Sequence, residues 1–173
     1  MNRRETLKKI MAATGGLVAL PVWARSWSVA DMNSHPSSFS IEQQDVLASV
    51  ADTIIPAGDT IGALSVGVDK FLQRLIDNCY EKAVQDNVKT QLAALEAAAQ
   101  NAYQKPFAGC DQLQRQMLLE KLADSQNKSE HDFFNLIKSE TIRGFNTSRE
   151  VMVNYLHYKL VPGHYSGCVD IKA

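Results

Sequence analysis

The chain has 173 residues, 45% of them hydrophobic, and a formal net charge of −1. This apolar content suffices for a buried core and excludes a disordered chain. Residues 1–30 carry five basic side chains and one acid, so the rest of the chain has a net charge of −5. A mildly acidic body of about 140 residues fits one domain and excludes a phosphate-binding footprint for nucleic acid.

The segment 1–30 is predicted to be an export signal. Basic residues precede an uncharged run over residues 10–24, and small residues offer cleavage after Ala24 or after Ala30. The run is too short for a comfortable membrane span, which needs roughly 20 apolar residues. We therefore expect a leader, not a transmembrane helix.

Two adjacent arginines make this leader more specific. Arg3-Arg4, followed by Leu7 and Lys8, resembles the twin-arginine signal, which exports proteins that are already folded. An ordinary secretory leader or an uncleaved anchor is the alternative. If the leader is a twin-arginine signal, the chain is expected to bind the twin-arginine translocase and to be exported to the periplasm.

A polar linker is predicted over residues 31–39, followed by a helical domain over residues 40–173. Ser40 with Gln43 forms a capping-box pattern, and Pro56 ends the first helix. Its apolar face is Leu47, Val50, Ala51 and Ile54. A second helix is expected over residues 65–79, with an inward stripe of Val68, Phe71, Leu72, Leu75, Ile76 and Cys79.

A long helix rich in strong helix formers follows over residues 81–103. Its inward residues are Val84, Val88, Leu92, Leu95, Ala99 and Ala102. Asp111 with Gln114 starts a fourth helix, whose expected inward residues are Leu113, Met117, Leu118 and Leu122.

Ser129 with Asp132 starts a fifth helix, and Gly144 is its expected end. Its inward residues are Phe133, Phe134, Ile137 and Thr141. A short last helix from Ser148 to Tyr158 precedes an irregular tail. No segment alternates as a strand does, so the prediction is an all-α fold of five to six helices in one compact domain.

The search for catalytic, cofactor-binding or metal-binding residues selects none in this chain. No dinucleotide, haem-attachment, zinc-protease or nucleophile-elbow motif is present after the leader. The spacing of the four histidines requires no metal; these are His35, His131, His157 and His164. Glu130 and Asp132 fit helix-start acids better than an acid–base pair. A small body that needs no cofactor suggests that a cofactor-bearing partner is exported with it.

Several blocks resemble one family. They are Leu47-Ala48, Ala51 to Pro56, Gly62-Ala63, Gly67-Val68, Gln104 to Phe107, Phe133-Phe134, Ile137-Lys138, Gly144-Phe145, Thr147-Ser148 and Pro162-Gly163-x-Tyr165-x-Gly167-Cys168. In this order, over about residues 40–170, the chain resembles the small subunit of gluconate 2-dehydrogenase, the subunit 3 family. Residues 143–146 depart from the aromatic-rich turn usual there.

The resemblance implies a non-catalytic subunit of a periplasmic sugar or sugar-acid dehydrogenase at the outer face of the inner membrane. The implied partners are a large FAD flavoprotein of the glucose–methanol–choline type and, in many such complexes, a multihaem cytochrome c. This chain would supply the export signal and stabilise the flavoprotein. Two other classes stay open: a stand-alone helical periplasmic enzyme, and a chaperone-like binding protein for another exported enzyme.

Three cysteines in an exported chain leave one unpaired. Cys79 and Cys110 form a disulfide, or else Cys79 is a small buried hydrophobe; the sequence favours neither. Cys168 is hypothesised to form a disulfide with the large subunit. The tail around it is expected to pack on that subunit through Pro162, Gly163, Tyr165, Gly167 and Cys168.

Overall fold

The computed structural model describes residues 37–159, 161 and 163, and this part is built of helices without strands. The α-helices are α3 (Ile41–Ile54), α4 (Val68–Cys79), α5 (Lys82–Tyr103), α6 (Gln112–Ala123) and α7 (Lys128–Asn146). Three short turns are η2 (Leu64–Val66), η3 (Phe107–Gly109) and the π-helical η4 (Val151–Tyr155). The all-α prediction is confirmed, and no helix in the described part is long and apolar enough to cross a membrane.

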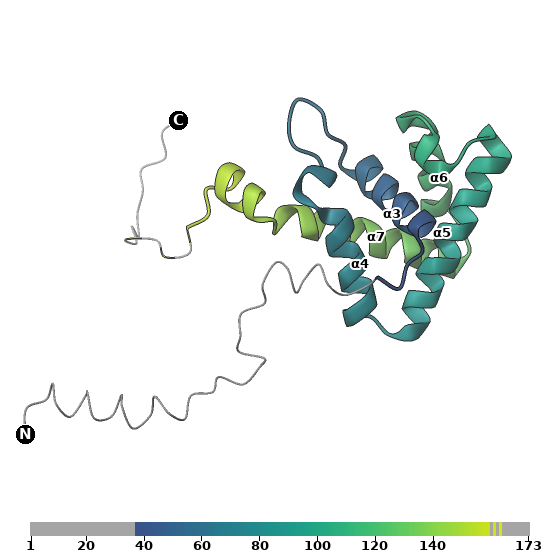
Figure 1. Ribbon diagram of the computed structural model, residues 1–173, viewed down its shortest axis with the longest axis horizontal. Helices are drawn as coiled ribbons and strands as arrows, with labels where there is room; N and C mark the ends of the chain where they lie inside the picture. Colours follow the sequence, from purple (N-terminus) through teal and green to yellow (C-terminus); the bar gives the residue numbers. More distant parts are fainter. Residues whose placement is uncertain (1–36, 160, 162, 164–173) are drawn as a thin grey trace, which may run out of the picture. The chain divides into compact units, whose positions relative to one another are not determined.

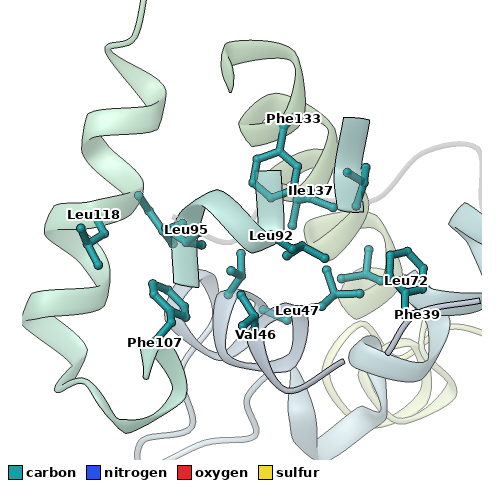
Figure 2. Packing of buried hydrophobic residues seen from close by; sticks show 14 of the residues in the cluster. Phe39, Val46, Leu47, Leu72, Leu92, Leu95, Phe107, Leu118, Phe133 and Ile137 are labelled. Carbon is teal, nitrogen blue, oxygen red and sulfur yellow. The ribbon is translucent and has the colours of Figure 1, made fainter. Parts of the chain in front are cut away.

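Helix α3 is the centre of the fold. It contacts α4, α5, α6 and α7, and Figure 1 shows it among them. The predicted capping box is present, because the Ser40 hydroxyl accepts from the Gln43 N–H while the Gln43 side chain accepts from the Ser40 N–H. Side chains from all five helices meet around α3 in one apolar core (Figure 2). The labelled members are Phe39, Val46, Leu47, Leu72, Leu92, Leu95, Phe107, Leu118, Phe133 and Ile137.

The folded body begins earlier than the predicted linker boundary. The Asp77 carboxylate on α4 accepts hydrogen bonds from the Ser37 hydroxyl at 3.1 Å and from the Ser38 N–H at 3.0 Å. Phe39 is buried in the core, and the Lys89 ammonium lies 5.4 Å from its ring centroid. Residues 37–39 are therefore part of the domain.

The predicted second helix is divided at Gly67. This residue has a left-handed backbone with φ of 73°, so η2 ends there and α4 starts at Val68. Four residues of α4 are buried, namely Val68, Leu72, Gln73 and Ile76. Cys79 is exposed at the last position of α4, so its predicted place on the inward stripe is wrong.

Helix α5 extends as predicted and buries Val88, Leu92, Leu95 and Ala99. Ala102, which was expected inside, is exposed, and Val84 is half-buried. The chain turns at Gln104, whose left-handed backbone places its N–H on the Gln100 carbonyl.

The predicted inward face of α6 is only half right. The Asp111–Gln114 capping box is present, yet Leu113 and Met117 are 68% and 46% exposed. Leu118 and Leu119 are buried, and Leu122 packs against the core.

An ion pair explains the rotation of α6. Arg115 donates from Nη2 to the Asp52 carboxylate of α3 at 3.0 Å and from Nη1 to the Ser49 carbonyl at 3.4 Å. Positions 115, 118, 119 and 122 lie on one helical face. Bringing Arg115 onto α3 therefore turns Leu113 and Met117 to the surface.

Helix α7 starts and ends at other residues than predicted. Its N-cap is Asn127, whose side chain accepts from the Ser129 N–H. Gly144 does not end it. The helix continues to Asn146, and Gly144 is buried where a Cβ would come 2.6 Å from the Phe71 ring of α4. Gly144 therefore permits the close approach of α4 and α7.

Candidate partner-binding surface

The residues considered for acid–base or metal chemistry have structural roles. The Glu130 carboxylate accepts from the Ser125 hydroxyl at 2.6 Å and from the Asn127 amide at 3.1 Å, and so fixes the start of α7. Asp132 pairs with Lys128 one turn away. His131 is exposed, and the Asn135 side-chain amide lies 3.1 Å from its Nδ1. Within the described residues no group of three or more histidine, cysteine or acidic side chains could hold a metal.

Cys79 and Cys110 are both free thiols in this structure. Cys79 is exposed, whereas Cys110 is buried and its thiol donates to the Pro106 carbonyl at 3.5 Å. Burial raises the pKa of Cys110, which keeps this thiol protonated and unreactive. The predicted alternative in which Cys79 is a buried hydrophobe does not hold, and the structure shows no bond between the two.

Exposed apolar side chains gather at the C-terminal end of the described chain. Ten large hydrophobic residues are exposed in the described part, and five of them lie between residues 153 and 161. These five are Val153, Tyr155, Leu156, Tyr158 and Val161, each at least half exposed. Because single exposed apolar residues are ordinary on soluble proteins, the clustering of five is what marks this segment.

We call residues 149–159 the C-terminal arm. Figure 1 shows it, in yellow-green, beyond the end of α7 and away from α5 and α6. Its base is fixed on the body: the Ser148 hydroxyl donates to the Phe145 carbonyl at 2.8 Å, and Val151 is buried. Beyond Val151 the arm's side chains are half-buried or exposed.

The arm is a wide turn stabilised by its own backbone. The Leu156 N–H donates to the Val151 carbonyl at 2.9 Å, and the Tyr158 N–H donates to the Met152 carbonyl at 2.8 Å. His157 between them has a left-handed backbone with φ of 51°. Such π-helical turns are rare and often occur at functional sites.

The sequence prediction of an ordinary helix up to Tyr158 missed this shape. A signal was nevertheless present, because residues 151–158 form an eight-residue run without a formally charged side chain in a chain that is 21% charged. In a surface segment, tyrosine, methionine and aliphatic residues without charges are typical of the centre of a protein interface.

Other site predictions lie outside the described residues. These are the export-signal residues Arg3, Arg4, Leu7 and Lys8, the histidines His35 and His164, and the tail residues Pro162, Tyr165, Gly167 and Cys168. Gly163 is described and is exposed, two residues after the exposed Val161. The predicted partner-binding tail therefore continues directly from the arm.

The described part is thus a helical domain that ends in an arm whose residues 151–158 carry no formal charge. Residues 41–163 match the family described as gluconate 2-dehydrogenase subunit 3, and the chain belongs to this family. The family is one subunit of a dehydrogenase complex. No curated protein and no solved structure matches the chain significantly.

Proposed function

We propose that this chain is the non-catalytic small subunit of a periplasmic FAD-dependent sugar or sugar-acid dehydrogenase. It carries the twin-arginine export signal for the complex and stabilises a large flavoprotein subunit. The observation that carries the proposal is the family match over residues 41–163, and the Arg3-Arg4 pair in the sequence supports its export part. FAD belongs to the large subunit in this scheme, and any haem to a third, cytochrome subunit.

The physical logic is that of a shared export signal. FAD is made in the cytoplasm and is inserted into the flavoprotein there. The large subunit therefore has to fold and bind FAD before it is exported. A twin-arginine signal on a tightly bound partner then serves both chains. The exposed apolar arm provides apolar surface that such a partner can cover.

The export step is tested by replacing Arg3 and Arg4 together with lysine. The charge is unchanged, but the twin-arginine pattern is lost, so both this chain and the flavoprotein are expected to stay in the cytoplasm. Cell fractionation followed by FAD and dehydrogenase assays measures this. Lys9→Arg with Arg25→Lys, two equally conservative changes outside the pattern, is the control and should export normally. Normal periplasmic dehydrogenase activity in the double-lysine variant would refute the shared-signal proposal.

A further inference from the structure

We propose that the C-terminal arm is the element by which this chain binds the large catalytic subunit, with its uncharged face seated in an apolar groove of that protein. The inference rests on the proposed function, because it names the surface through which that subunit is held. It assigns the contact to side chains of the arm, chiefly Val153, Tyr155, Leu156 and Tyr158.

The first support is that the fold does not use these side chains. The core cluster of the described residues begins at Phe39 and ends at Ile137, and among the arm residues only Val151, at the base of the arm, is buried. Val153, Tyr155, Leu156 and Tyr158 are 50–59% exposed. The segment nevertheless lies within the region that matches the family, which extends to residue 163. The family pattern therefore includes a segment that this domain does not need for its own core.

The second support is the chemistry of the arm. Tyrosine combines a rigid apolar ring with a hydroxyl that needs a partner, and such residues are enriched where binding energy is concentrated. Asn154 and His157 add further hydrogen-bonding groups between the apolar ones. A protein groove can pair these groups while covering the aliphatic ones. A lipid surface favours lysine and arginine among the apolar residues. In the arm these occur only at its two ends, as Arg149 and Lys159, and none lies between positions 151 and 158.

The third support is that the arm already has a defined shape. The hydrogen bonds to the Val151 and Met152 carbonyls close its turn without help from the body. His157 tolerates the left-handed conformation better than most residues do. A segment that is preshaped loses less conformational freedom on binding, which favours tight association. The anchored base, from Ser148 to Val151, then transmits the position of the arm to α7.

The test uses the full-length chain with an affinity tag after Ala173, expressed in its native host. Flavoprotein retained by the tagged chain is quantified as released FAD. The arm variant is Val153→Ser with Leu156→Ser, and the control is Leu113→Ser with Met117→Ser, which removes the exposed apolar pair on α6. We expect the arm variant to retain at least tenfold less FAD than the wild type, and the control to match the wild type.

The outcomes separate this inference from the proposed function. No FAD retained by the wild-type chain refutes the proposed function itself. FAD retained equally by the wild type and the arm variant, or lost equally from both variants, refutes only the role of the arm. Because all four positions are exposed, both variants should keep the wild-type helical circular dichroism and Tm.

Two other occupants of the arm are examined with the same variants. A dimer of the isolated chain in size-exclusion chromatography that disappears with Val153→Ser and Leu156→Ser would mean that a second copy covers the arm. Co-sedimentation with phosphatidylglycerol vesicles that depends on the same residues would mean a membrane surface. Either result overturns the assignment to the catalytic subunit.

Discussion

Gly62 shows how a single residue fixes the loop between α3 and η2. The Ala63 N–H donates to the Ile55 carbonyl at 2.9 Å and closes the loop, while the Gly62 N–H donates to the Ser65 hydroxyl at 3.2 Å. A Cβ on the buried Gly62 would come 2.4 Å from the backbone nitrogen of Ala57. Backbone cannot move aside as a flexible side chain can.

Gly62→Ala is therefore expected to lower the free energy of unfolding by about 1–3 kcal/mol, as overpacking does. Gly58→Ala in the same loop is the matched control, because a Cβ there meets nothing within 4 Å. It should change stability by no more than about 0.5 kcal/mol. Urea unfolding of the mature chain measures both, and equal midpoints for the two variants would contradict the steric argument.

At the scale of the element, α4 and α7 are joined by a small polar cluster. The Tyr80 hydroxyl donates to Glu140 Oε1 at 2.9 Å, and Arg143 Nη2 lies 2.6 Å from Glu140 Oε2. The Arg143 guanidinium also lies over the Phe71 ring, 5.8 Å from its centroid. Burial, followed by the hydrogen bond and the negative charge of Glu140, raises the pKa of Tyr80 above its ordinary value of 10.0.

This shift predicts a pH dependence at the alkaline end. The folded state holds the Tyr80 proton more tightly than the unfolded state, so the associated stability is complete below pH 10 and is lost as pH rises through the folded pKa. Tyr80→Phe has no proton to lose. The difference in unfolding free energy between wild type and Tyr80→Phe should therefore be constant below pH 10 and shift in favour of the variant above it. A constant difference up to pH 11.5 would contradict the Tyr80–Glu140 coupling.

Local patterns predicted the helices better than their orientations. The capping boxes at Ser40 and Asp111 are visible in sequence because their partners are three residues away. The face that α6 buries depends on Asp52, which is 63 positions from Arg115. The sequence prediction placed Leu113 and Met117 on the inward face of α6, whereas the buried face carries Arg115, Leu118 and Leu119.

At the ends of helices, Gly144 and Cys79 also have positions that the local sequence pattern does not predict. A glycine near the end of a helical pattern predicts a C-cap, but Gly144 is needed for contact with Phe71 instead. Cys79 continues an apolar stripe in sequence, yet α4 ends there and exposes it. The arm was missed as a surface because helical periodicity says nothing of a π-helical turn.

At the scale of the whole molecule, the described domain has one core, built around α3, and its arm beyond Val151 lies outside that core. The family match agrees with a division of labour between the chains of a dehydrogenase complex. The proposed function therefore predicts different properties for the isolated chain and for the complex with the flavoprotein.

The last prediction tests this division of labour. The isolated mature chain is expected to bind neither FAD nor haem and to have no dehydrogenase activity. The polar clusters of its described part hold the helices: one fixes the start of α7, one is the Arg115–Asp52 ion pair, and one is the Tyr80–Glu140 hydrogen bond. Co-expression with the proposed flavoprotein partner should raise the yield of soluble, active flavoprotein, and the control is expression of the flavoprotein alone. Absorption spectra and activity of each purified preparation measure this. Dehydrogenase activity or a flavin band that stays with the single chain would identify it instead as a stand-alone enzyme. Flavoprotein that is equally soluble and active without this chain would remove its stabilising role.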